Sequence, residues 1–302
     1  MMKNACLRVG IVAVFLFMFS VASAADPQPE VKIAPLVQAC FANGAAVLNG
    51  RIFAVGGTSG RNVVGRVDSL DLSSGVWERV GDLNVPRYFH GVAVVSGKIY
   101  VLGGYESNRK HTSKVEVYDS TTKKWSVITS LPRERDRVAA VALGQKIYLI
   151  GGMGKGNLDT VDVYDVTADR WHEGPKIPEP AHGVSAAVFE GKIHVLWMKK
   201  HWVLDKGVWK PLSAAPFHLF TRLEVVGEKL YSLSIGKGAR LHVYDSPNDK
   251  WIPQASVPTQ LPSFRFASVT IRNLIVTLGG DGGRTGASSR VFVYDSEKNS
   301  WR

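Results

Sequence analysis

The sequence predicts an all-β protein built as a ring of six four-stranded blades, a β-propeller. Two observations support this fold class: an Asp followed by a Trp recurs six times along the 302 residues, and short apolar runs rich in β-branched residues precede every copy. The repeats are about 46 residues long and lack a sustained helical period, which is typical of propeller blades. A chain of this length also exceeds the usual size of one compact core, so a body built from repeats is favoured.

The repeats share landmarks that recur in the same order. Each ends with a hydrophobic residue, an Asp and then a Trp; these are Asp71 and Trp77, Asp119 and Trp125, Asp165 and Trp171, Asp205 and Trp209, Asp245 and Trp251, and Asp295 and Trp301. An apolar run precedes each pair, and four of these runs end in Gly-Gly, as in KIYVLGG at residues 98–104. We expect the Asp side chains to accept turn amides and the aromatic rings to fill the space between blades.

These landmarks divide the chain into six repeats, at about residues 44–84, 91–131, 139–178, 185–213, 222–257 and 267–302. A single four-stranded blade cannot bury both of its faces, whereas blades stacked around an axis cover one another. Repeats four and five carry Trp197-Met198 and Ser234-Ile235 in place of the two glycines. Their loops are therefore expected to differ, while the number of blades stays six.

The two ends of the chain are expected to meet in the sixth blade. The sequence stops at Trp301-Arg302, where other repeats continue into a fourth strand such as WSVITSLP at residues 125–132. Residues 31–36 (VKIAPL) have the pattern of such a strand. We predict that this N-terminal strand completes the last blade, because an open sheet edge would favour aggregation.

Residues 1–24 have the pattern of an export signal. Lys3 and Arg8 flank the start of an apolar run at residues 9–19 that is short for a membrane span, and Ala22-Ser23-Ala24 offers a cleavage site. We expect an exported domain of residues 25–302 without a transmembrane segment, periplasmic in a bacterium and secreted otherwise. An uncleaved membrane anchor is the alternative. After cleavage Cys40 would be the only Cys, so no disulfide could form within the chain.

Composition and charge describe an ordinary globular chain. Hydrophobic residues make up 45% and charged residues 21%, which excludes wholesale disorder and polytopic membrane proteins. The formal net charge of +11 raises polyanions as possible partners. Because the basic residues are spread along the chain rather than gathered in one run, nucleic-acid binding is not expected. We expect a monomer.

The repeat resembles the kelch family, whose unit carries a di-glycine, then Tyr-Asp, then a Trp about six residues further on. The resemblance covers about residues 31–302, although Leu70 and Leu204 replace the Tyr in two repeats. It implies a six-bladed propeller whose chain ends pair within one blade. It also implies a channel mouth, lined by the loops that lead into the inner strands, of the kind that kelch domains present to acidic peptides.

Aligning the repeats brings cations and aromatics together at that mouth. The candidate ligand-binding residues are Arg87, Tyr88, His90, Arg135, Arg137, His182, His218 and Arg265. Guanidinium groups bind carboxylates bidentately, and rings supply apolar area, so this set suits an acidic small molecule or an acidic protein partner. Two alternatives stay open: solvated loops of a basic protein contain Arg in any case, and the aromatic side chains could plug the channel.

The sequence contains no motif that names a reaction. Gly-x-Ser-x-Gly, His-Glu-x-x-His, a phosphate loop and Cys-x-x-Cys are all absent, so neither a cofactor nor a metal site is expected. Exported six-bladed kelch proteins include N-acetylneuraminate epimerases. A mutarotase or epimerase acting on an acidic sugar, with mouth His residues exchanging protons, is therefore the alternative to a binding module.

Overall fold

The computed structural model describes residues 33–216, 221–234, 240–261, 265–281 and 286–302. Within these ranges the regular structure consists of strands, and no helix is long and apolar enough to cross a membrane. The strands form six antiparallel four-stranded sheets, so the all-β propeller prediction is confirmed. Blade 1 contains β1 (Gly44–Leu48), β2 (Arg51–Ser59), β3 (Asn62–Asp71) and β4 (Val76–Asp82), and blade 2 contains β5 (Gly91–Val95), β6 (Lys98–Leu102), β7 (Lys114–Asp119) and β8 (Lys124–Ser130). Blade 3 contains β9 (Ala139–Leu143), β10 (Lys146–Ile150), β11 (Val161–Asp165) and β12 (Arg170–Gly174), and blade 4 contains β13 (Ser185–Phe189), β14 (Lys192–Trp197), β15 (Lys200–Asp205) and β16 (Val208–Leu212). Blade 5 contains β17 (Thr221–Val226), β18 (Lys229–Ser234), β19 (Arg240–Asp245) and β20 (Lys250–Pro253), and blade 6 contains β21 (Ala267–Ile271), β22 (Leu274–Leu278), β23 (Val291–Asp295) and β24 (Ser300–Trp301).

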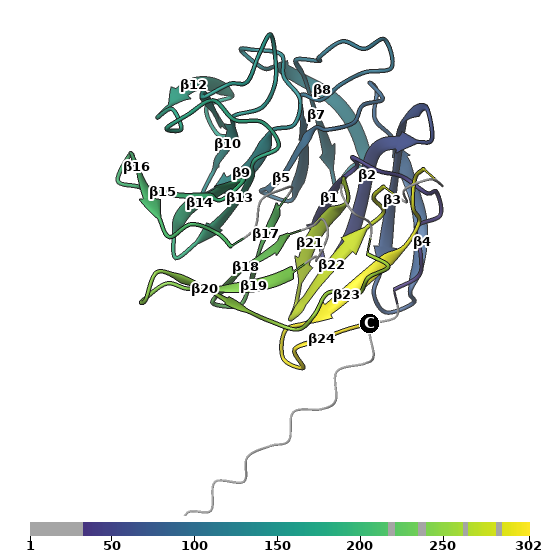
Figure 1. Cartoon of the computed structure of the whole chain (residues 1–302). Coiled ribbons are helices and arrows are strands. Elements are labelled where there is room, and N and C mark those ends of the chain that lie inside the picture. The colour runs from purple at the N-terminus through teal and green to yellow at the C-terminus, as the bar shows by residue number, and fades with distance from the viewer. Residues whose placement is uncertain (1–32, 217–220, 235–239, 262–264, 282–285) are drawn as a thin grey trace, which may run out of the picture. The chain divides into compact units, whose positions relative to one another are not determined.

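The first strand of each blade faces the axis of the ring. Figure 1 shows these inner strands gathered at the centre with the other three strands of each blade outside them. Each inner strand contacts the inner strands of both neighbouring blades, and β1 contacts β21 as well as β5. The ring is therefore closed by contact between the first and last blades.

The Asp and aromatic landmarks have the structural roles expected from the sequence. In blade 2, Asp119 accepts the N–H groups of Thr121 at 2.8 Å and Thr122 at 3.2 Å, which lowers the pKa of its carboxyl. The ring centroid of Tyr118 lies 5.3 Å from that of Trp125 and 5.6 Å from that of Phe53 in blade 1. Aromatic area therefore fills the space between successive blades.

The di-glycine positions bring neighbouring backbones close together. Gly103 and Gly104 have φ values of 62° and 108°, and a Cβ added to Gly103 would lie 2.5 Å from the carbonyl oxygen of Arg135. Only glycine combines this conformation with this approach at low energy. In blade 4, Met198 takes the left-handed conformation in a tight turn between β14 and β15, so the altered sequence changes the loop and keeps the blade.

The N-terminal segment lies against the sixth blade. After the fourth strands of blades 1 to 3, Leu83 donates its N–H group to Gly65 within β3, and Leu131 and Ile177 donate theirs to residues just before the third strand of the same blade. Leu36 makes the corresponding hydrogen bond to the carbonyl oxygen of Ser289, at 2.8 Å, just before β23. The segment is thus hydrogen-bonded to blade 6, the blade that the sequence indicated. It does not form the predicted fourth strand, because residues 33–36 are not assigned to a strand and β24 is the fourth strand of the blade; residues 31 and 32 lie outside the described residues.

Candidate functional site

A series of backbone hydrogen bonds between neighbouring loops shapes one mouth of the central channel. Equivalent residues of five loops adopt left-handed conformations, with φ of 53° at Ala42, 55° at Phe89, 50° at Arg137, 65° at Gly183 and 61° at Arg265. Four of their N–H groups bond to a neighbouring loop: Ala42 donates to Arg265 O, Phe89 to Ala42 O, Arg137 to Phe89 O and Gly183 to Arg137 O, at 2.6 to 3.0 Å. We call these five residues the mouth ring; its position in the remaining loop, residue 219, lies outside the described residues. These hydrogen bonds join neighbouring loops and so hold the Cα atoms of the mouth ring in place.

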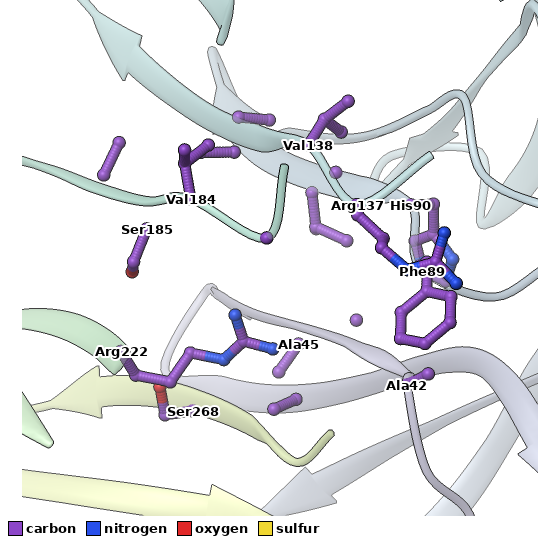
Figure 2. A pocket seen from close by; sticks show the side chains of 18 of the residues that line it. Ala42, Ala45, Phe89, His90, Arg137, Val138, Val184, Ser185, Arg222 and Ser268 are labelled. Carbon is purple, nitrogen blue, oxygen red and sulfur yellow. The ribbon is translucent and has the colours of Figure 1, made fainter. Parts of the chain in front are cut away.

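A pocket of about 250 Å³ opens at the mouth ring and continues between the inner strands. Figure 2 shows Arg137 and Phe89 on one side of this pocket and Arg222 extending into it from β17. Three arginines line the pocket, Arg137, Arg222 and Arg265, and among the described lining residues Glu224 is the only acid. The site is thus an aromatic and cationic cavity, which favours anionic ligands.

Two of the guanidinium groups lie close to the ring of Phe89. The guanidinium carbon of Arg137 lies 4.5 Å from its ring centroid and that of Arg265 lies 5.7 Å away. Each guanidinium is also near a carboxylate: Arg137 donates to Asp136 at 3.0 Å, and Arg265 lies 3.9 Å from Asp281. Stacking on the ring holds the planar guanidinium groups at the mouth, which limits the entropy lost when they bind a ligand.

The structure places Arg87 and Arg135 inside blades rather than at the mouth. Both side chains are fully buried. Arg87 pairs with Glu116 at 2.7 Å and donates to the carbonyl oxygen of Gly103, and Arg135 pairs with Asp162 and donates to that of Gly151. Burial lowers the pKa of both guanidinium groups. With all this hydrogen bonding directed inward, these two arginines fasten loops to blades, and we leave them out of the candidate site.

The histidines of the predicted site are separated. His90 lines the pocket but is buried, and desolvation lowers its pKa to about 3, so its ring is neutral at pH 7. His182 is half-buried and lies at the mouth with Nδ1 at 2.9 Å from Asn157 Oδ1; burial lowers its pKa as well. His218 lies outside the described residues. This arrangement gives no specific support to proton exchange on a sugar, so the mutarotase alternative is not carried forward.

Tyr88 belongs to a cluster of rings at the rim. Its ring centroid lies 5.0 Å from that of Phe89 and 5.5 Å from that of Tyr105, which in turn lies 5.0 Å from His111. Backbone bonds between Tyr88 and Tyr105 hold two loops of blade 2 together. Tyr88 therefore supports the loop that carries Phe89 and does not itself line the pocket.

Arg222 and Glu224 are not among the site residues predicted from the sequence. Both lie on the inner strand β17, where alternation points every second residue into the channel. The equivalent positions of blades 1 to 4 hold only Ala and Val, and this contrast is the signal that could have found them. In the described part of the chain, no group of three or more His, Cys, Asp or Glu side chains is arranged to hold a metal ion.

The propeller fold and repeat landmarks define a class of kelch-type propellers, and sequence comparison agrees. The profile of the KLHDC2/KLHL20/DRC7 Kelch-repeats domain matches residues 14–197, and that of the Kelch motif matches residues 262–302. The chain belongs to the kelch-repeat family. Propellers of this family are typically protein-interaction modules.

Similar curated proteins include three kelch-repeat proteins. Kelch-like protein terF of Aspergillus terreus is 25% identical over 271 residues, covering 85% of this chain and 54% of that protein. Human Kelch-like protein 28 is 36% identical over 109 residues, covering 33% and 19%, and the F-box/kelch-repeat protein At1g67480 of Arabidopsis thaliana is 42% identical over 76 residues, covering 25% and 20%. The chain thus spans between about a fifth and about half of the length of these relatives.

A solved structure titled "Structure of YjhT" has the same fold. It superposes with a TM-score of 0.76 and 15% identity, covering 89% of this chain and 99% of that chain. At this identity the similarity concerns the fold alone.

Proposed function

We propose that this propeller is an exported binding module that recognises an acidic ligand through the pocket at the mouth ring. The ligand is a carboxylate-bearing small molecule or an acidic segment of a protein partner. The observation that carries the proposal is the lining of the pocket, in which three arginines and Phe89 face a cavity whose only described acid is Glu224.

The geometry of the mouth suits carboxylate recognition. Guanidinium groups form two parallel hydrogen bonds to a carboxylate, and charge-assisted bonds of this kind are stronger than neutral ones. Arg137 and Arg265 are held against Phe89, whose ring also offers apolar area to the rest of the ligand.

The proposal is tested with a fluorescent peptide rich in Glu and a matched peptide carrying Gln at the same positions. We expect the Glu peptide to bind with an affinity that falls as salt rises, and the Gln peptide to bind much more weakly. Arg137→Met and Arg265→Met should each weaken binding of the Glu peptide by roughly tenfold in fluorescence anisotropy.

Arg170→Met is the matched control, because Arg170 is exposed on β12 in the outer part of blade 3 and does not line the pocket. It should bind as the parent does. Equal affinity for the Glu and Gln peptides, or an equal effect of all three substitutions, would contradict recognition of carboxylates at the mouth.

Export and a monomeric state belong to the same proposal. The support for export is the charged, apolar and small-residue order of residues 1–24. Mass spectrometry of the protein from its producing cells should give a chain that begins at Ala25, and sedimentation should give the mass of a single chain. A chain that keeps Met1 and sediments with membranes would instead indicate the anchored form.

A further inference from the structure

The inner strands line the channel at two levels. The burial pattern of β1, β5, β9, β13 and β21 alternates, so that every second side chain faces the axis, and β17 follows the same order over its first four residues. The level next to the mouth ring consists of Ala45, Val92, Ala140, Ala186, Arg222 and Ser268; the level below it consists of Val47, Val94, Ala142, Val188, Glu224 and Thr270.

The wall of the channel is chemically one-sided. Blades 1 to 4 contribute only Ala and Val at both levels, whereas blades 5 and 6 contribute all four polar residues. Three of these four are bonded to one another: the carboxylate of Glu224 accepts the hydroxyl of Ser268 at 2.5 Å and that of Thr270 at 2.9 Å. Both carboxylate oxygens of Glu224 thus accept hydroxyl groups of the neighbouring inner strand β21.

Arg222 is the one of these four polar residues that lies outside the hydrogen bonds between Glu224, Ser268 and Thr270. Its Nε and Nη2 donate to the carbonyl oxygen of Phe266 at 3.1 and 2.9 Å, and these are its hydrogen bonds among the described residues. The rest of the guanidinium faces the pocket, where Figure 2 shows it extending into the open space. Two bonds to one carbonyl fix the orientation of the group, and a fixed guanidinium beside small apolar side chains leaves room and donors for an anion.

We propose that Arg222 forms a carboxylate subsite inside the channel, below the mouth ring. This inference deepens the proposed function and rests on it: the ligand enters past Phe89, places one carboxylate on Arg222, and lays its carbon atoms against the Ala and Val wall. The cavity of about 250 Å³ lies below the roughly 300 to 1,000 Å³ of sites for drug-sized ligands. The carboxylate therefore comes either from a small free acid or from a single Asp or Glu side chain of a partner.

The test uses one probe for each source. Difluoroacetate, observed by ¹⁹F NMR line broadening, reports binding of a small free acid, and a labelled hexaglutamate peptide reports binding of an acidic segment. Both are titrated into the parent protein and into Arg222→Met, which keeps the aliphatic stem and removes the charge. Ala45→Leu is the second variant, because it fills the same level of the channel and leaves Arg222 in place. Arg170→Met again serves as the matched control.

We expect both channel variants to weaken one probe by roughly tenfold or more, with Arg170→Met unchanged. If the channel variants lose binding of difluoroacetate, the carboxylate at Arg222 comes from a small acid. If they lose binding of hexaglutamate alone, it comes from a side chain of a partner. If the parent binds hexaglutamate and Arg137→Met weakens it while neither channel variant has any effect on either probe, the subsite is wrong and the proposed function stands. If the parent binds neither probe, both the subsite at Arg222 and the proposed function are wrong.

Discussion

Arg87 and Glu116 form an ion pair from which water is excluded, since neither side chain has any exposed surface. Arg87→Met keeps most of the side-chain volume and leaves the Glu116 carboxylate buried without its cation. Removing one partner of a buried pair destabilises by about 3 to 5 kcal/mol. We expect a loss of this size in the free energy of unfolding, measured by urea denaturation.

The double variant Arg87→Met/Glu116→Gln is the control for this prediction. It removes the orphaned charge, and the amide oxygen of Gln keeps an acceptor for one of the two backbone N–H groups, those of Asn84 and Val85, which donate to different carboxylate oxygens at 2.6 and 3.0 Å. Part of the lost stability should therefore return. A single variant as stable as the parent would show that Arg87 is not needed to neutralise Glu116.

Arg87 and Arg135 show how much about single residues could be predicted from the sequence. The spacing correctly placed Arg87 and Arg135 in the loops before the inner strands, but loop position does not fix the direction of a long side chain. The available signal was on other strands: Glu116 and Asp162 occupy buried positions in β7 and β11, where an acid needs a cation. Arg137 and Arg265 instead lie near Asp136 and Asp281, which are loop residues, and they remain at the mouth.

The N-terminal segment shows how a short stretch of irregular backbone can complete an element. Leu36 is 6% exposed and packs in the core shared by blades 6 and 1, while Trp77 Nε1 donates to Ala34 O at 3.0 Å. Trp209 of blade 4 makes the same bond to Pro175, which follows the fourth strand of blade 3. Residues 33–36 thus do for blade 1 what the end of a fourth strand does elsewhere in the ring.

Leu36→Ala should therefore destabilise the propeller by about 2 to 5 kcal/mol, as other large-to-small changes in cores do. Val37→Ala is a control one residue away, because Val37 is 59% exposed, and it should change the free energy of unfolding by less than about 0.5 kcal/mol. Urea denaturation of the two variants checks the prediction. Equal effects would mean that the segment does not hold the ring closed.

At the level of elements the sequence was informative because the repeats are independent copies of one pattern. Six Asp and Trp landmarks predicted six blades even though repeats four and five lack the di-glycine. The channel wall was harder to predict, because the inner strands are short and mostly Ala and Val. Their alternation becomes readable only when the six strands are compared position by position, which then singles out Arg222 and Glu224.

The whole molecule is expected to be sensitive to acid. Burial lowers the pKa of His90 to about 3, of His194 to about 4 and of His201 to about 3, against about 6.5 in an unfolded chain. Between these values the unfolded state binds more protons, so stability present at pH 7 is lost as the pH falls from about 6.5 towards 4. Each group contributes up to about 1.4 kcal/mol per pH unit.

His194 and His201 allow this prediction to be separated from the titration of carboxylates. Their rings lie at the interface of blades 4 and 5, with Nδ1 of His194 and Nε2 of His201 3.0 Å apart. Blade 2 carries Tyr100 and Val115 at the equivalent positions. His194→Tyr/His201→Val should lose less stability than the parent when melting temperatures at pH 7 and pH 4.5 are compared, whereas parallel losses would contradict the role of the buried imidazoles.

The mouth ring separates what holds the protein together from what the protein can recognise. Its hydrogen bonds join backbone groups rather than side chains, and although the left-handed conformation disfavours β-branched residues, the five described positions already hold Ala, Phe, Arg, Gly and Arg. The side chain at each position can therefore differ while the backbone arrangement of the mouth stays the same. Propellers that share this backbone arrangement can substitute the mouth-ring residues one at a time and so acquire a new ligand specificity without any change in the blades.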